Sequence, residues 1–350
     1  MTAPPSDPSF SDTDNTIAIG SLADLARAAG TSVSTASRAL SGHSSVNEQT
    51  RLRIRTLADA HGFQPNRLAR NLRLQRTQSI GLVLPLGHET GQHLSDPFFL
   101  SLLGHLADGL TERGYDLVLS RVIPHDGGWL DRLVDSGRID GLILIGQSDQ
   151  SAVIDRVAAR YAPIVVWGAD LPGQCYLTVG SDNRLGGARA AQHLIAIGRR
   201  RLLYLGNASA PEFAERLAGF EDAVGAAGPD VAGEALDLHM TPDAAYAAIA
   251  EHLANNPAPD AIFAASDVVA MSALRALREQ GLRVPQDVAV VGYDDVTLAA
   301  HTTPPLTTIR QDLMAGAAAL IELLFRRIAG EPAQSRRLDP ELIVRGSSVA

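Results

Sequence analysis

The sequence predicts a small all-α N-terminal helix-turn-helix domain followed by a two-lobed α/β body built on parallel sheets. A helix–glycine–helix pattern occupies residues 22–41. From Ser79 onward, short runs of Val, Ile and Leu alternate with helical patterns, which is typical of parallel sheets formed from right-handed βαβ units. About 270 residues of this alternation exceed one sheet of ordinary size, so two α/β lobes are expected.

The helical domain rests on the spacing of small and apolar residues. Residues 22–41 read LADLARAAGTSVSTASRALS. Gly30 stands where a tight turn needs a positive φ, and Ser32 is placed to cap a second helix. The inward faces of the two helices are apolar: Leu22, Leu25, Ala26, Ala29, Ala36, Ala39 and Leu40. This spacing predicts a helix-turn-helix whose second helix enters the major groove, with an ordinary αα-hairpin as the alternative.

The remaining elements follow in order along the chain. Residues 46–60 predict a third helix, whose Val46, Leu52, Ile54 and Leu57 are available to close the small core. The apolar runs interpreted as strands are residues 80–84, 117–119, 142–145, 164–167, 202–205, 261–264 and 288–291. The helices expected between them include residues 99–113, 185–197, 244–253 and 268–280.

Domain boundaries follow from shifts in composition. Residues 1–16 are rich in Ser, Asp, Thr and Pro and are expected to form a disordered tail. Residues 17–65 form the predicted helix-turn-helix domain, residues 66–78 a basic hinge or linker, and residues 79–350 the two-lobed body.

Composition limits the class of protein. Hydrophobic residues make up 45% of the 350 residues and charged residues 20%, which excludes a disordered chain. No run reaches the ~18 apolar residues of a membrane helix, and residues 1–16 have neither the basic start nor the apolar stretch of an export signal. The single cysteine, Cys175, allows no internal disulfide. We therefore expect a cytoplasmic protein with no membrane contact.

Charge is distributed unevenly along the chain. The formal net charge is −9, yet residues 17–79 contain nine Arg against Asp24, Glu48 and Asp59. A basic segment joined to an acidic body indicates that one part of the chain binds an anionic polymer, although a solvated charged face gives the same pattern.

With these motifs in place, the sequence is similar to the LacI/GalR family of bacterial transcriptional regulators. The similarity covers nearly the whole chain after residue 17, in the family's order and spacing. Its motifs are LADLARAAGTSVSTASRAL, VNEQTRLRI, GFQPNRLARNLR, RTQSIGLVLP, DPFF, GYDLVLS, IDGLILIG, RLAGF, ASDVVAMSALRAL, VPQDVAVVGYDD and PPLTTIRQ. The resemblance implies a body of the type I periplasmic-binding-protein fold, which holds a ligand between its lobes.

The resemblance implies DNA-binding roles for the second helix. Val33, Ser34 and Arg38 match positions that read bases in the family. Val33 offers a methyl contact, Ser34 donates or accepts a hydrogen bond, and Arg38 pairs with guanine O6 and N7. A phosphate contact is the alternative for Arg38. The residues expected to bind phosphates are Ser32, Thr35 and Ser37.

The basic stretch from Asn66 matches the family's hinge helix, which orders on the operator. By this resemblance Leu72 inserts into the minor groove, while Ala69 keeps that face of the helix slim. The alternative is a simple linker helix with Leu72 in a core. A helix this short is marginal alone, so its order requires DNA and a second hinge beside it. The resemblance thus implies a homodimer on a nearly palindromic double-stranded operator.

The implied effector site lies beyond the carboxyl ends of the strands of the body. Arg216 and Asp294 are the main candidates, because either is costly to bury without a partner. Aromatic candidates for stacking on a sugar or base are Phe98, Phe99 and Trp167. The other candidates are Asp182, Met240, Ser266 and Asp267.

Several candidates have structural alternatives. Asp182 and Asp267 are equally placed to cap the helices that follow them, and Phe99 and Trp167 to pack only in the core. Met240 stands where many family members have an aromatic residue, so one stacking wall is softer or absent here. Residues 86–95 are longer and richer in His than is usual in the family, but loop histidines without fixed spacing are usually solvated, and no metal is expected.

We interpret the chain as a DNA-binding repressor of carbohydrate-use genes, modulated by a small sugar-like effector and needing no cofactor. A nucleobase or nucleoside effector is the alternative. A sugar-binding transport protein is a third hypothesis, opposed by the basic helical domain and the lack of an export signal. An enzyme is not expected, because the sequence contains no nucleophile elbow, P-loop, HExxH or dinucleotide-binding motif. We expect the sugar to release the protein from DNA, with corepression as the alternative.

Overall fold

The computed structural model describes residues 19–63, 76–87 and 91–349. It divides into two units, Met1–Arg76 and Thr77–Ala350, each of which is described by itself. The predicted tail and the predicted hinge residues Asn66, Ala69 and Leu72 lie outside the described residues.

The first unit contains three helices, α1 (Leu22–Ala28), α2 (Val33–Leu40) and α3 (Glu48–Ala60). Each begins at a side-chain cap: Ser21, Ser32 and Asn47 accept a hydrogen bond from the backbone N–H three residues later. Gly30, with φ of 60°, makes the turn between α1 and α2. The predicted helix-turn-helix is confirmed.

Small residues form the core of this unit. The buried side chains are Ile19, Leu25, Ala26, Ala29, Ala36, Ala39, Val46, Ile54 and Ala58. The expectation that Leu52 closes this core is wrong, since Leu52 is 65% exposed. Helix α3 turns Ile54 and Ala58 inward, and a residue two positions before Ile54 points to another side of the helix.

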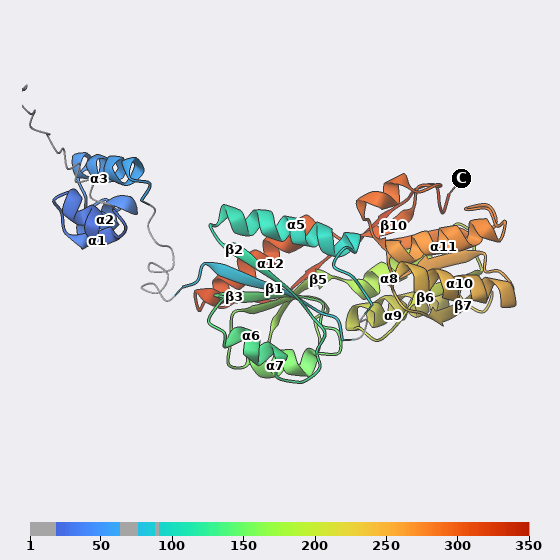
Figure 1. Cartoon of the computed structure of the whole chain (residues 1–350). Coiled ribbons are helices and arrows are strands. Elements are labelled where there is room, and N and C mark those ends of the chain that lie inside the picture. The colour runs from blue at the N-terminus through green and yellow to red at the C-terminus, as the bar shows by residue number, and fades with distance from the viewer. Residues whose placement is uncertain (1–18, 64–75, 88–90, 350) are drawn as a thin grey trace, which may run out of the picture. The chain divides into compact units, whose positions relative to one another are not determined.

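The first lobe of the second unit is a fully parallel six-stranded sheet. Its strands, in spatial order, are β11 (Arg336–Leu338), β5 (Leu177–Ser181), β4 (Ile164–Trp167), β3 (Gly141–Ile145), β1 (Ser79–Pro85) and β2 (Asp116–Val122). On one face, Leu82 and Leu84 pack with α5 (Pro97–Glu112) and α12 (Leu313–Ile328). On the other, Val83 packs with α6 (Trp129–Val134) and α7 (Ser151–Ala158), as Figure 1 shows.

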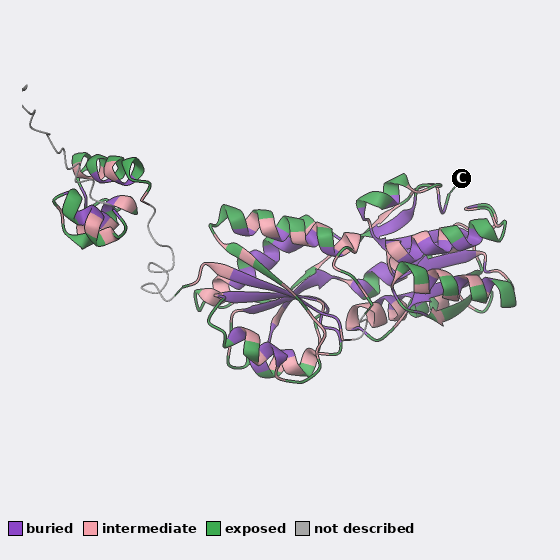
Figure 2. Ribbon diagram, viewed as in Figure 1, coloured by how far each residue is buried: buried purple, intermediate pink, exposed green. Residues whose placement is uncertain are grey.

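The second lobe repeats this arrangement. Its strands, in spatial order, are β12 (Glu341–Ile343), β10 (Thr307–Arg310), β9 (Ala289–Asp294), β8 (Ala261–Ala264), β6 (Arg201–Gly206) and β7 (Ala232–Asp237). Only β12 is antiparallel to its neighbour. The helices are α8 (Asn183–Ala196), α9 (Pro211–Ala226), α10 (Pro242–Asn255) and α11 (Asp267–Glu279), with a short 3₁₀ helix at Thr297–His301. The central strands of both sheets are buried, whereas the edge strands β2, β7, β11 and β12 are mostly exposed or half-buried (Figure 2).

The chain passes between the lobes three times. It leaves the first sheet after β5, returns to it after β10 to form α12 and β11, and crosses again to add β12 to the second sheet. The predicted two parallel α/β lobes are confirmed. No described helix is long and apolar enough to cross a membrane.

Glycines allow α8 and α9 to pack at close range. A Cβ atom at Gly219 would overlap the backbone oxygen of Arg184, and a Cβ atom at Gly187 would overlap that of Arg216. Any larger residue at either position would therefore move one helix against the other.

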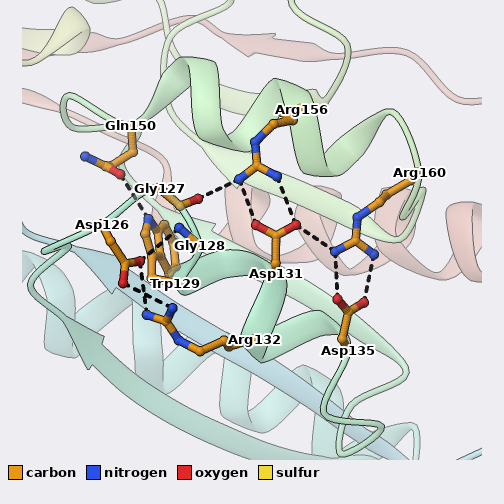
Figure 3. A network of polar contacts seen from close by, with 10 residues as sticks. All are labelled: Asp126, Gly127, Gly128, Trp129, Asp131, Arg132, Asp135, Gln150, Arg156 and Arg160. Atoms are coloured by element: carbon orange, nitrogen blue, oxygen red, sulfur yellow. Dashed lines mark hydrogen bonds and ion pairs between the residues drawn. The ribbon is translucent and has the colours of Figure 1, made fainter.

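A surface network of charges ties α6 to α7 (Figure 3). The Asp131 carboxylate accepts hydrogen bonds from Arg156 at 2.7 Å and from Arg160 at 2.8 Å, and Arg160 also pairs with Asp135 at 2.7 Å. The hydrogen bonds from both arginines lower the pKa of Asp131. The network fixes two short helices that have no side-chain caps.

Candidate functional site

The exposed face of α2 carries the side chains expected to read DNA. Ser32, Ser34 and Arg38 are exposed, and Val33 is an apolar side chain that is 43% exposed. The other two candidates, Thr35 and Ser37, are half-buried. The face thus presents a methyl surface, hydroxyl groups and a guanidinium on one helix, which are the contacts that major-groove readout uses.

Local hydrogen bonds order the start of this helix. The Ser32 hydroxyl accepts from the Thr35 backbone N–H at 3.2 Å and lies 2.9 Å from the hydroxyls of both Ser34 and Thr35. These hydroxyl groups gather at the helix N-terminus, where the helix dipole favours a phosphate.

The arginines of this unit divide into paired and unpaired ones. Arg27 pairs with Asp24 at 3.1 Å, and Arg51 pairs with Glu48 at 2.7 Å. In the part of the chain that the structure describes, Arg38, Arg53 and Arg55 make no ion pair or side-chain hydrogen bond, so their charges are available to an anionic partner.

A cavity with about 690 Å³ of empty space opens between the two lobes of the body. This volume includes space that is open to solvent. Seven of the nine predicted effector residues line it: Phe98, Phe99, Trp167, Arg216, Met240, Ser266 and Asp294. Their roles in binding remain predictions, but the structure places them together.

Aromatic rings form the first lobe's side of the cavity. Phe98 lies 5.6 Å from Phe99 and 6.2 Å from Trp167, measured between ring centres. Phe99 and Trp167 also belong to the buried core of that lobe. Packing in the core and stacking on a ligand are therefore compatible for Phe99 and Trp167, because each residue belongs to the core and also lines the cavity.

Arg216 projects from α9 into the cavity and is almost fully buried. Its Nε donates to Asn183 Oδ1 at 2.8 Å and one terminal nitrogen donates to the Ala265 carbonyl at 2.6 Å. The guanidinium also lies over the rings of Phe213 and Tyr293. These contacts fix the charge in position before any ligand arrives.

Asp294 ends β9 opposite this guanidinium. Its Oδ1 lies 4.0 Å from the nearest Arg216 nitrogen and accepts a hydrogen bond from Gln311 Nε2 at 2.7 Å. Its φ is 115°, a backbone conformation that non-glycine residues rarely adopt. Burial raises the pKa of this carboxyl, and the nearby Arg216 opposes the rise.

Two predicted effector residues do not line the cavity. Asp182 caps α8, accepting from the Leu185 backbone N–H at 2.9 Å, because an Asp before a helix finds that donor locally. Asp267 is fully buried and accepts hydrogen bonds from the Thr308 hydroxyl at 2.6 Å and the Val296 backbone N–H at 2.9 Å. Asp267 does not cap α11 either, since Ser266 does.

The cavity also contains polar residues that the sequence analysis did not single out: Gln92, Asp96, Ser148 and Glu212. Asp96 precedes Pro97 and caps α5, and Glu212 follows Pro211 at the start of α9. Both positions follow a strand, so the carboxyl-end rule that identified Arg216 and Asp294 could have identified them too.

Among the described residues, no group of three or more metal-binding side chains occurs. His88 and Glu89 of the His-rich loop lie outside them.

Comparisons with known proteins agree with this architecture. The model for bacterial regulatory proteins of the lacI family matches residues 21–66, and the model for a periplasmic binding protein-like domain matches residues 191–348. The chain is 35% identical to the HTH-type transcriptional regulator CelR of Thermobifida fusca over 92% of its own length and 96% of that protein. It is 30% identical to the ribose operon repressor of Escherichia coli (strain K12), covering 94% of this chain and all of that one.

Two solved structures are similar along almost the whole chain. A complex of the transcriptional regulator CelR with cellobiose matches with a TM-score of 0.69 and 32% identity, over 94% of this chain and 99% of that one. The lac repressor dimer bound to operator and the anti-inducer ONPF matches with a TM-score of 0.83 over the same shares; at 24% identity it supports the fold.

Proposed function

Because the chain belongs to the LacI family of bacterial regulatory proteins, we propose that it is a transcriptional repressor that binds a nearly palindromic operator as a homodimer. Its relatives are transcriptional regulators, a family that is not enzymatic. The observation that carries the proposal is the exposed face of α2, where Val33, Ser34 and Arg38 stand together and the Arg38 guanidinium makes no ion pair with any described residue. The protein acts in the cytoplasm, where its DNA lies.

We assign DNA binding to residues 17–65, the hinge to residues 66–78, and effector binding and dimerisation to residues 79–350. Asn66, Ala69 and Leu72 of the hinge contact the minor groove in this proposal, and Leu72 is the wedge. Two hinges side by side order together, which is why the dimer is needed.

The effector is a small sugar held in the inter-lobe cavity. An aromatic wall, a fixed guanidinium and buried carboxyl acceptors suit a ligand with an apolar ring face and several hydroxyl groups. Sugar binding closes the lobes, changes the spacing of the two hinges and releases DNA. The coupling between the sites is expected at ~1–3 kcal/mol, as in other allosteric proteins.

The test compares the whole chain with a fragment that starts at Thr77. Duplexes selected by the full-length protein from a random pool are titrated by fluorescence anisotropy, with and without sugars. We expect a two-fold symmetric consensus, nanomolar binding by the full chain, no binding by the fragment, and retained sugar binding by both. A full-length protein that is dimeric yet selects no consensus contradicts the proposal.

A further inference from the structure

Carboxyl groups outnumber positive charges in the inter-lobe cavity. Its lining contains Asp96 from the first lobe, Glu212 and Asp294 from the second, and a single cation, Arg216, among the described residues. The lining therefore holds more acidic groups than one guanidinium can neutralise.

The charge of Arg216 is already engaged. Two of its nitrogens bond to Asn183 and to the Ala265 carbonyl, and Asp294 is the acidic group that it approaches within ion-pair distance. No ion pair joins Asp96 or Glu212 to any described basic side chain. These two carboxyls consequently define the electrostatic character of the space left for a ligand.

Glu212 reaches across the gap between the lobes. It lies in the first turn of α9, in the second lobe, yet a Cβ atom on Gly168 of the first lobe would come within 2.9 Å of its Oε1. Gly168 directly follows Trp167, a member of the aromatic wall. A side chain at position 168 would therefore crowd the Glu212 carboxyl in this position, together with Gln147 Oε1, which lies 2.6 Å from the same point.

The Oε1 atom of Glu212 is buried and has no hydrogen-bond partner in the described part of the chain. A buried acceptor without a donor is costly, so such atoms in native proteins usually serve a ligand or a water molecule. In a cavity beside a stacking wall, a hydroxyl group of a bound sugar is a suitable donor.

We propose that Glu212 is a specificity-determining residue that accepts a hydrogen bond from a hydroxyl group of the effector, and that the carboxyl-rich cavity admits uncharged saccharides while rejecting phosphorylated or carboxylated ones. This inference depends on the proposed function, which supplies the existence of an effector, and it adds the chemical class of that effector. Rejection follows because Arg216 is the only basic side chain among the described lining residues and is already bonded, so an added anion meets carboxyl groups without a free cation to neutralise it. The unpaired Oε1 atom of Glu212 adds to this discrimination, because a ligand without a hydrogen-bond donor at that point leaves the atom unsatisfied.

The test is calorimetric titration of the full-length protein, without DNA, using neutral sugars and their anionic counterparts. The probes are ribose with ribose 5-phosphate and cellobiose with cellobionate. We expect a neutral sugar to bind at least tenfold tighter than its anionic counterpart. E212Q keeps the shape of the side chain but removes the charge, so it should weaken neutral-sugar binding about tenfold and reduce the neutral-to-anionic affinity ratio.

The matched control is E215Q, one turn further along α9. Glu215 is half-buried but does not line the cavity, so E215Q should leave both affinities and their ratio unchanged. Thermal unfolding checks that both variants fold. Equal or tighter binding of the anionic sugars, or an E212Q ratio equal to that of the unaltered protein, overturns the inference. Failure of every probe to bind also overturns it, whereas DNA binding measured separately decides the proposed repressor function.

Discussion

The guanidinium of Arg216 lies 3.7 Å from the centre of the Tyr293 ring, and Tyr293 is completely buried. Both side chains bond to the same oxygen, Asn183 Oδ1, at 2.8 Å from Arg216 Nε and 3.2 Å from the Tyr293 hydroxyl. Asn183 of α8 and Tyr293 of β9 thus hold the guanidinium that Arg216 of α9 presents to the cavity. A ligand meets a guanidinium that needs little reorganisation to bind it.

Arg216→Lys should lower effector affinity at least tenfold. A lysine ammonium cannot keep the stacking on Tyr293 and the bonds to Asn183 and Ala265 while also offering a donor to the ligand. Operator affinity without effector should stay within twofold, so the variant represses but no longer responds. Calorimetry and fluorescence anisotropy measure the two affinities. Arg184→Lys, an exposed residue paired with Asp222, is the control and should change neither.

Arg38→Ala should lower operator affinity by roughly 1–3 kcal/mol and relax the preference at one base pair. Arg38→Lys keeps the charge but loses the bidentate geometry, so it distinguishes base reading from a phosphate contact. If Arg38 reads a base, Lys restores part of the affinity and none of the preference. Anisotropy titrations against single-base operator variants give both quantities, and an unaltered preference in Arg38→Ala argues against base reading.

Gly219→Ala should destabilise the second lobe by about 1–3 kcal/mol, because the added methyl group overlaps the Arg184 carbonyl. The displaced α9 carries Arg216, so effector affinity should fall as well. Gly225→Ala is the matched control on the same helix. Nothing lies within 4 Å of its Cβ position, and alanine there should stabilise by about 0.5–1 kcal/mol. Chemical denaturation measures both changes, and a Gly219 variant as stable as the Gly225 variant contradicts the close packing.

The stability difference between Asp294→Asn and the unaltered protein should depend on pH. Burial raises the pKa of Asp294 to about 7, so the folded state keeps a proton that the unfolded state has lost. The contribution of this carboxyl to stability is therefore full at acidic pH and is lost as the pH rises toward and through 7. The asparagine variant has no such titration, so its stability relative to that of the unaltered protein should increase by about 2–3 kcal/mol between pH 5 and pH 8.

Asp222→Asn serves as the control for this pH dependence. Its hydrogen bond with Arg184 lowers the pKa of Asp222 below its usual value, so the carboxylate stays charged over the same range. Denaturation midpoints for the Asp222 variant should run parallel to those of the unaltered protein from pH 5 to pH 8. If the denaturation midpoints of Asp294→Asn also ran parallel to those of the unaltered protein, the result would contradict the raised pKa of Asp294.

Local patterns in the sequence predict those features that depend on neighbouring residues. Ser32 identifies the start of α2 because its cap lies three residues away, and the strands are visible as Val- and Ile-rich runs. Arg216 and Asp294 follow from the family resemblance and from the position of each after a strand. The expectation for Leu52 fails because the sequence does not fix how α3 is rotated about its own axis. A small rotation of the helix turns one of its several apolar residues toward solvent.

Features that depend on distant parts of the chain are not visible in this way. Asp182 and Asp267 have the right chemistry for a ligand, but one finds a donor in its own helix and the other in Thr308, which lies 41 residues further along the chain. Glu212 and Asp96 become part of the cavity only when two lobes come together. The return of the chain to the first lobe for α12 and β11 likewise has no local signal.

The three passages of the chain between the lobes constrain how this protein is made. Neither lobe is a continuous segment, and β12, which completes the second sheet, follows every other described strand of both lobes in the sequence. During synthesis, the helical unit can fold soon after it leaves the ribosome, whereas the first lobe must wait for α12 and β11 and the second lobe for β12. A premature stop codon shortly before Glu341 would thus leave an intact helix-turn-helix attached to an incomplete body, a product for proteases rather than a shorter repressor.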